Sequence, residues 1–351
     1  MSESKTTPKK FDPTTTISSE FGIFGIPLKE EECRLVLLPV PWEVTTSYGV
    51  GASNGPRIIR DASEQIDLFD FETKNAYEAG YFMREISKDI AGKSAKYKVL
   101  AQEVIQMKTD QSDNLEKIAS LTKEVNAASA ELTDWVYAQT KEILAKGKLF
   151  GLVGGDHSTP LGAIKAICEK HPDMGILHID AHSDTRKAYQ GFTQSHASIM
   201  YNVMQLPQPP KKLVQVGIRD FCEEEYNYVE SHPSIKTFFD IALKQRLLKG
   251  EAWASIATDI IQELPQKVYI SFDIDGLDPR YCPSTGTPVL GGLSTDEVFF
   301  LFNLVAQSGR QIVGFDLNEV SSGTEQEAEW DGNVGARMLY KLCNWTVVTN
   351  K

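Results

Sequence analysis

The 351-residue chain has few cysteines, and their pattern excludes two common kinds of site. Their number is odd and no CxxC spacing occurs, so the chain does not resemble a zinc ribbon or a disulfide-stapled domain. We interpret them as reduced thiols and expect a cytoplasmic protein. The cysteines are Cys33, Cys168, Cys222, Cys282 and Cys343.

Long apolar runs and excess positive charge are also missing. No apolar run approaches the roughly 18 residues that a membrane-spanning helix needs. The first 20 residues lack the apolar core of a signal peptide and are rich in Ser, Thr, Lys and Pro, so we expect a flexible arm at 1–20. The net charge of −12 disfavours a nucleic-acid surface, which would be basic. We therefore expect neither nucleic acid nor membrane as a partner.

Short apolar runs alternate with amphipathic stretches over residues 21–351, which we expect to form one catalytic domain. Near-continuous apolar runs are typical of strands buried on both faces of a parallel sheet. The alternation predicts an α/β fold, a three-layer α/β/α sandwich around a mainly parallel sheet. The predicted strands are Arg34–Leu38, Leu149–Val153, Gly175–Ile179, Leu213–Ile218, Lys236–Phe239, Lys267–Phe272 and Ile312–Leu317, with helices at Ser158–Lys170 and Thr295–Ser308.

Proline is absent between Pro56 and Pro160, and a helical apolar pattern occupies residues 97–146. Asp113, with Glu116 three residues later, resembles a capping box that starts a long helix. An amphipathic helix lying on the sheet is the simplest interpretation, although coiled-coil pairing fits the same pattern. The role of this segment, as an oligomer contact or a lid, stays open.

Clusters of potential metal ligands follow three of the predicted strands. They lie in the stretches GGDHS (154–158), DAHSD (180–184) and DIDGLDP (273–279). Alternate residues of an extended segment share a face, so Asp180, His182 and Asp184 point the same way, as do Asp273 and Asp275. Ligands of parallel α/β sheets bind beyond the carboxyl ends of the strands. Together the three stretches predict a metal site there.

The composition of these clusters indicates more than one ion. Buried carboxylates are strongly destabilising without a counter-charge. Two ions about 3.5–4 Å apart accommodate several carboxylates better than a single ion does. Imidazole combined with carboxylate suits Mn, Ni, Fe or Zn better than calcium or magnesium. His178, one residue off the ligand face, is interpreted as a core residue, and His171 and His232 as loop residues.

The three motifs resemble those of the ureohydrolase family, which includes arginases and agmatinases. The resemblance extends from about Arg34 to Cys343 and includes the stretch VPWEVTTSYGVGASNGPRIIR near the start. It implies an arginase-like fold, a homo-oligomer (trimer or hexamer) and two divalent ions, Mn(II) or Ni(II). It further implies that a metal-bridging hydroxide attacks the carbon of a small guanidino-compound substrate and releases urea.

The resemblance also implies a role for each ligand. His157 and Asp184 would bind one ion, His182 and Asp275 the other, and Asp180 and Asp273 would bridge both. Asp184 would also help to transfer a proton to the leaving nitrogen. Two further residues match family positions that contact substrate: His196, which would move protons, and Glu319, which would hold the guanidinium.

The substrate stays open between two candidates. Thr45 stands where agmatinases usually carry glycine or a small polar residue, and it is expected to contact substrate. The stretch after Glu319 reads SSG, not the Asn-Pro frequent in the family. These departures are similar to agmatinase-like members that hydrolyse free guanidine with nickel. An agmatine-like guanidino amine and free guanidine are therefore both expected substrates, ahead of arginine.

Two alternatives come from other functional classes. A metal-dependent deacetylase shares this fold but would need one metal and lacks a counterpart of His157. A non-catalytic regulatory homologue would usually have lost a ligand, whereas all the expected ones are present here.

Overall fold

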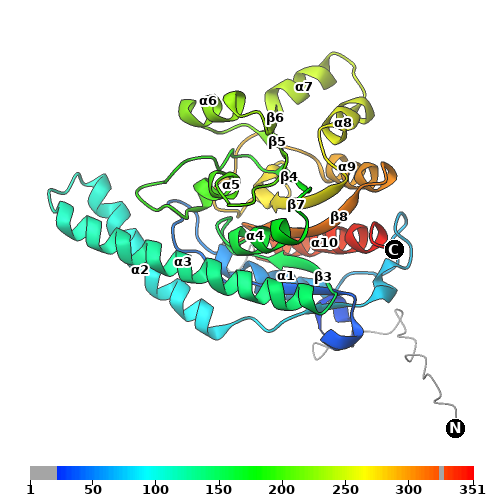
Figure 1. Cartoon of the computed structure of the whole chain (residues 1–351), viewed down its shortest axis with the longest axis horizontal. Coiled ribbons are helices and arrows are strands. Elements are labelled where there is room, and N and C mark those ends of the chain that lie inside the picture. The colour runs from blue at the N-terminus through cyan, green and yellow to red at the C-terminus, as the bar shows by residue number, and fades with distance from the viewer. Residues whose placement is uncertain (1–21, 324–327) are drawn as a thin grey trace, which may run out of the picture.

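The computed structural model describes residues 22–323 and 328–351. The arm predicted at 1–20 lies outside these residues. Within them, eight strands form one sheet in the order β2-β1-β3-β8-β7-β4-β5-β6, and every neighbouring pair is parallel (Figure 1). The strands are β1 (Leu35–Pro39), β2 (Tyr81–Met83), β3 (Leu149–Val153), β4 (Gly175–Ile179), β5 (Leu213–Ile218), β6 (Ile235–Phe239), β7 (Lys267–Asp273) and β8 (Gln311–Asn318).

Helices cover both faces of this sheet, which confirms the predicted three-layer α/β/α fold. They are α1 (Gly55–Ser63), α2 (Lys88–Thr109), α3 (Leu115–Ala145), α4 (Leu161–Lys170), α5 (Ile199–Met204), α6 (Glu223–Ser231), α7 (Asp240–Leu248), α8 (Trp253–Gln262), α9 (Thr295–Gln307) and α10 (Ala328–Val348). Alternate residues of the strands belong to two separate apolar cores, one on each face of the sheet. In β1, Leu35 and Leu37 belong to the first core, and Val36 and Leu38 belong to the second.

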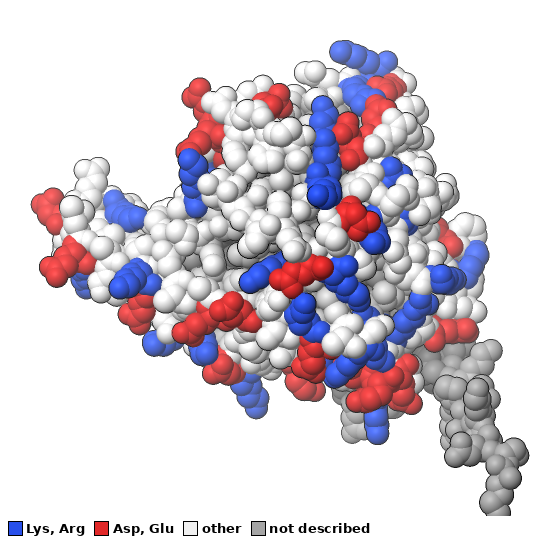
Figure 2. All heavy atoms as spheres, in the orientation of Figure 1, with Lys and Arg blue, Asp and Glu red and all other residues white. Residues whose placement is uncertain are grey.

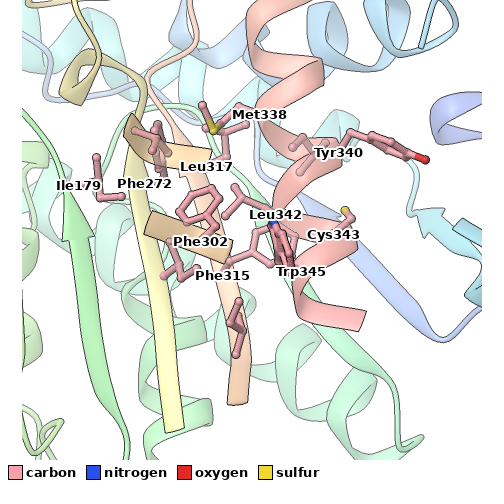
Figure 3. Close-up of a cluster of buried hydrophobic side chains, with 14 of the residues drawn as sticks. Ile179, Phe272, Phe302, Phe315, Leu317, Met338, Tyr340, Leu342, Cys343 and Trp345 are labelled. Atoms are coloured by element: carbon pink, nitrogen blue, oxygen red, sulfur yellow. The ribbon is translucent and has the colours of Figure 1, made fainter. Parts of the chain in front are cut away.

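The helices divide between these two cores. The first core contains buried residues of α1 and of α7–α10. Figure 3 shows its centre, where Leu342 and Trp345 of α10 pack near Phe315 of β8. The second core contains buried residues of α2–α6. Because both faces of the central strands are covered, their burial is nearly complete, as the continuous apolar runs predicted.

The segment predicted as helical at 97–146 consists of two helices, not one. Helix α2 begins earlier than expected, at Lys88, and the chain turns back through residues 110–114, where Gln111 has a positive φ of 53°. Helix α3 is capped by Asn114, whose side chain accepts the Lys117 N–H at 3.1 Å. The predicted cap, Asp113, is therefore off by one residue. The two helices run side by side as a hairpin that extends past the sheet (Figure 1).

No helix in the described ranges is long and apolar enough to cross a membrane. On the face drawn in Figure 2, acidic and basic side chains are interspersed and no large patch of one sign appears.

The order of the strands positions the functional site. Strands β3 and β4 follow one another in sequence, but β8 and β7 lie between them in the sheet. All four are parallel, so their carboxyl ends, and the loops that follow them, lie at one edge. In sheets of this kind, ligands bind at that edge.

Candidate metal centre

Loops at the ends of these four strands bring together the predicted ligand residues. His157 follows β3, Asp180 follows β4, Asp275 follows β7 and Glu319 follows β8. These side chains are almost fully buried, with exposed fractions of 6% or less. Such a set of ionisable groups is rare in a protein interior without partners or a bound ion.

Three carboxylates surround one nitrogen of His157. Its Nδ1 atom lies 3.0 Å from Oδ2 of Asp180, 3.1 Å from Oδ2 of Asp273 and 3.6 Å from Oδ2 of Asp184. His157, His178, Asp180 and Asp184 also form a group whose potential ligand atoms lie within 4.8 Å of one another. This is the first ligand cluster.

A second cluster adjoins the first and shares Asp180 with it. It comprises Asp180, His182 and Asp275, again within 4.8 Å of one another. Nδ1 of His182 lies 3.1 Å from Oδ2 of Asp275 and 3.5 Å from Oδ1 of Asp180. Asp180 therefore presents one oxygen to each cluster, which is the geometry of a bridging carboxylate.

Hydrogen bonds place a proton on one nitrogen of His157, Nε2. The Ser271 hydroxyl donates to Oδ1 of Asp316 at 2.9 Å, so its oxygen is left to accept from Nε2 of His157, also at 2.9 Å. In the neutral ring a proton on Nε2 leaves Nδ1 with a lone pair. Burial opposes a charge on His157, yet its contacts with Asp180 and Asp273 raise its pKa well above the usual range, so Nδ1 also attracts a proton. A cation between Nδ1 and the carboxylates would replace that proton, and this geometry fits a metal ligand.

His178 was predicted to be a core residue, and it is fully buried, but it also contacts the site. The Gln215 amide nitrogen donates to the Ser183 carbonyl at 2.7 Å, which fixes the amide orientation, and lies 3.1 Å from Nδ1 of His178. Nδ1 is thus the acceptor, and Nε2 donates to Oδ2 of Asp180 at 2.8 Å. Both ring nitrogens are used, so His178 orients Asp180 and has no nitrogen left for a metal.

The pKa values report the same excess of negative charge. Burial, and then the neighbouring Asp180 and Asp275, raise the pKa values of Asp184 and Asp273 well above their usual range. Burial opposes a charge on His182, yet Asp275 and Asp180 raise its pKa to about 12. Sites that attract protons this strongly are also the sites at which metal ions replace protons.

Local backbone geometry allows the close approach of these loops. A Cβ at Gly155 would lie 1.9 Å from the Trp42 carbonyl oxygen, so only glycine fits there. Asp184 and Glu319 have positive φ values of 55° and 62°, which are uncommon outside glycine and cluster at functional sites. The Glu319 carboxylate accepts the His157 N–H at 2.8 Å, which links the loop after β8 to the loop after β3.

One cavity gives access to the clusters. Of the predicted residues, His157, His182, Asp184, His196, Asp273 and Glu319 line it, whereas Asp180 and Asp275 do not. Thr45 is not among the lining residues either. Its hydroxyl lies 3.4 Å from Nδ1 of His196, so it reaches the cavity through that imidazole. Burial lowers the pKa of His196 to about 4, which keeps the ring neutral near pH 7.

The cavity also contains residues that the sequence did not single out. They are Ser47, Arg186, Tyr189, Ala197, Asp220, Phe221, Glu225 and Thr287. Asp220 follows β5, so the strand-end criterion used for the other ligands would have found it. Its side chain is 68% exposed and lies 3.8 Å from Nε2 of His182. Arg186 pairs with Glu225 at 3.3 Å, and no local sequence pattern indicates that pair.

Comparisons with known proteins identify the family of this chain. Residues 33–344 match the Arginase family. The chain is 30% identical over 321 residues to N(1)-aminopropylagmatine ureohydrolase of Thermus thermophilus, covering 88% of this chain and 89% of the relative. It is 29% identical over 319 residues to the agmatinase of Proteus mirabilis, with 88% of each chain covered.

Solved structures agree on the fold. Proclavaminate amidinohydrolase from Streptomyces clavuligerus superposes with a TM-score of 0.70 at 21% identity, covering 96% of this chain and all of the other (100%). Its low identity limits that comparison to the fold. The match to the Arginase family covers most of the chain. The chain therefore belongs to the arginase family.

Proposed function

We propose that this protein is an amidinohydrolase that binds two divalent metal ions, Mn(II) or Ni(II), and releases urea from a small guanidino compound. The observation that carries the proposal is the pair of adjoining ligand clusters that share Asp180, whose residues His157, His182 and Asp184 line a cavity together with Glu319. In this proposal His157 and Asp184 bind one ion, His182 and Asp275 the other, and Asp180 and Asp273 bridge.

The balance of charge supports two ions and a cationic substrate. Asp180, Asp184, Asp273 and Asp275 carry four negative charges when ionised, which two divalent ions match. The charge of Glu319 remains. Burial, and then Asp273 and Asp156, raise the pKa of Glu319 well above its usual range, so an empty cavity disfavours its ionised form. A guanidinium, always charged near pH 7, supplies the missing cation.

Glu319 and Asp184 have distinct tasks in this proposal. Glu319 binds the guanidinium through charge-assisted hydrogen bonds and so fixes the trigonal carbon above the clusters. Bound divalent ions supply a hydroxide at neutral pH by lowering the pKa of water. Asp184, which lines the cavity, accepts the proton of the attacking group and passes it to the departing nitrogen.

His196 serves the leaving group. Its ring lines the cavity, is neutral near pH 7, and lies next to the hydroxyls of Thr45 and Ser195, each 3.4 Å from Nδ1. A neutral imidazole can hydrogen-bond the leaving nitrogen without repelling the guanidinium charge. The contact with Thr45 restrains rotation of the His196 ring and so holds the ring in the orientation that this hydrogen bond requires. The role of His196 is narrower than the predicted one, whereas Thr45, which was expected to contact the substrate, acts here through His196 and does not line the cavity.

Two observations favour different substrates. The exposed carboxylate of Asp220 at the cavity mouth favours a cationic tail, as in an agmatine-like guanidino amine. The curated relatives include enzymes named for agmatine and for aminopropylagmatine. The buried Thr45–His196 contact favours the second candidate, free guanidine, because it restrains His196 without any help from a substrate tail.

A urea-release assay tests the proposal. Purified protein loaded with Mn or with Ni is incubated with guanidine, agmatine, guanidinobutyrate, guanidinoacetate or arginine. Urea from agmatine, with a KM that Asp220→Asn raises, supports the guanidino amine. Urea from guanidine, with a KM that Asp220→Asn leaves unchanged, supports the second candidate. No urea from any compound with either metal contradicts the proposed function.

The family resemblance also predicts a trimer or hexamer. Sedimentation or light scattering of the metal-loaded protein measures the mass, and a 39.1 kDa monomer at micromolar concentration would contradict that prediction.

A further inference from the structure

The α2–α3 hairpin contacts two loops that reach the cavity from distant strands. We call residues 43–53, after β1, the Glu43 loop, and residues 186–198, after β4, the Gly191 loop. In the sheet, β3, β8 and β7 lie between β1 and β4. Four steps of roughly 4.8 Å separate the two strands by about 19 Å, so the sheet alone does not bring the loops together. Helix α3, with 31 residues, is long enough to span that separation.

Helix α2 holds the Glu43 loop through a buried carboxylate. The Glu43 N–H donates to the Ser94 hydroxyl at 2.9 Å, and the Lys98 ammonium pairs with the Glu43 carboxylate. That carboxylate is 1% exposed and accepts the N–H groups of Gly51 at 3.0 Å and Ser53 at 3.1 Å. A single side chain of Glu43 therefore organises the loop that carries Thr45 and Ser47, and Lys98 supplies its counter-charge.

Both helices hold the Gly191 loop at a second point. The Asn126 amide donates to the Gly191 carbonyl at 3.1 Å and accepts the Thr193 N–H at 3.0 Å. The Lys108 ammonium donates to the carbonyl of Gln190. Gly191 has a φ of 94°, and a Cβ there would lie 2.9 Å from the Lys108 nitrogen.

A buried side chain adds an apolar anchor to this loop. Phe192 is fully buried in the same core as Val104 of α2 and Val125 of α3. The Gly191 loop is therefore anchored in the core to which the hairpin also contributes, in addition to its hydrogen bonds with the hairpin.

The two loops meet at the cavity. Thr45 of the Glu43 loop lies against His196 of the Gly191 loop, and the ring of Tyr189 contacts His196 edge-on at 5.9 Å between centroids. We infer that the α2–α3 hairpin is the element that sets the relative position of these two loops. Lys98 and Asn126 are then positioning residues for the His196 imidazole. The inference rests on the proposed function for its kinetic consequence only, because the positioning itself is measurable without turnover.

Hydrogen–deuterium exchange tests the positioning. We expect Lys98→Met to speed exchange of the Gly51 and Ser53 backbone N–H groups by about 10-fold or more. We expect Asn126→Ala to speed exchange of the Thr193 backbone N–H group by a similar factor. Lys98→Arg keeps the charge and should restore slow exchange. Lys123→Met, an exposed lysine of α3, is the matched control. Exchange in both variants equal to that of the control would overturn the inference.

Kinetics supply the second measurement. A displaced His196 should lower kcat by about 10- to 100-fold in Lys98→Met and in Asn126→Ala. KM, set by the Glu319 contact, and metal content should stay within about 2-fold. Unchanged kcat together with faster exchange would overturn the link to His196. If the wild-type protein releases no urea, the proposed function fails while the exchange data still decide the positioning. If one variant does not fold, the other supplies the same test on its own loop.

Discussion

Nε2 of His178 lies 2.8 Å from Oδ2 of Asp180, and Gln215 forces the tautomer that donates this bond. This hydrogen bond fixes the orientation of Asp180, the carboxylate shared by the two ligand clusters. Partners of this kind orient metal ligands, and their loss typically costs about 10- to 100-fold in metal affinity.

We therefore predict that His178→Leu weakens the binding of Mn or Ni by about 10- to 100-fold while the fold is retained. Metal affinity is measured by competition with a chromophoric chelator, and the fold by circular dichroism. His232→Leu, at a histidine outside the clusters, is the control and should bind metal normally. Wild-type affinity in His178→Leu would show that Asp180 needs no such support.

Removal of the metal should lower stability. The buried carboxylates would lose their counter-charge, and the protein would lose the free energy that metal binding adds to folding. We expect close to two ions per chain by elemental analysis and a fall in Tm of several degrees after chelation, reversed by Mn or Ni. One zinc ion per chain, or no metal after metal-supplemented expression, would contradict the two-ion assignment.

Glu319→Gln should abolish turnover without loss of metal. The amide keeps the size of the side chain but loses the charge that the guanidinium needs, so we expect urea release to fall by about 100-fold or more. Elemental analysis should still find wild-type metal content. Retained activity would show that the guanidinium is anchored elsewhere.

The pH dependence of stability has a predictable contribution from Glu30. The Arg84 guanidinium, and also the Lys146 ammonium, lower the pKa of Glu30 from 4.5 to about 2, although burial opposes this. A lowered pKa in the folded state means that the contribution is complete above about pH 4.5 and is lost as the pH falls towards 2.

Accordingly, Glu30→Gln should cost about 1–2 kcal/mol of unfolding free energy at pH 7, with a smaller difference at pH 3. Urea unfolding at the two pH values measures it. Glu31→Gln, at an exposed neighbour, should show almost no cost at either pH. A difference for Glu30→Gln that grows as the pH falls would contradict the sign of this coupling.

The sequence predicted the central strands well because burial on both faces leaves a local pattern. Leu149–Val153, Gly175–Ile179 and Leu213–Ile218 have the predicted bounds. Strand β2 was missed because three residues at the sheet edge carry too little pattern. The start of α3 was predicted to within one residue by the cap at Asp113, but the separate helix α2 before it was not, because no proline or glycine at residues 110–114 marks a turn.

Part of the candidate site was likewise predictable from the sequence and part was not. That the candidate ligands gather at one edge of the sheet was predictable, because each follows a strand. The predicted reason for their alignment was wrong: Asp275 lies in a 3-10 helix, Ile274–Gly276, and Asp184 has a φ of 55°, so neither belongs to an extended segment with alternating side chains.

The partners that hold these ligands were not predictable. Nothing near Gln215 in the sequence indicates that it selects the tautomer of His178, and nothing near Lys98 indicates that it neutralises Glu43. Those contacts depend on the order of the strands and the path of the hairpin, which local patterns do not contain.

The strand order also constrains how the protein matures during synthesis. The chain leaves the ribosome from its N-terminus, so β3 and β4 emerge long before β7 and β8, the two strands that fill the space between them. Until residues near Asn318 are available, β3 and β4 lack the two strands that join them in the finished sheet. His157 and Asp180 cannot acquire their shared surroundings before that point. On the proposed function, the metal clusters could be completed only after the final two strands are in place, and a chain stalled earlier would lack the strands that cover the edges of β3 and β4.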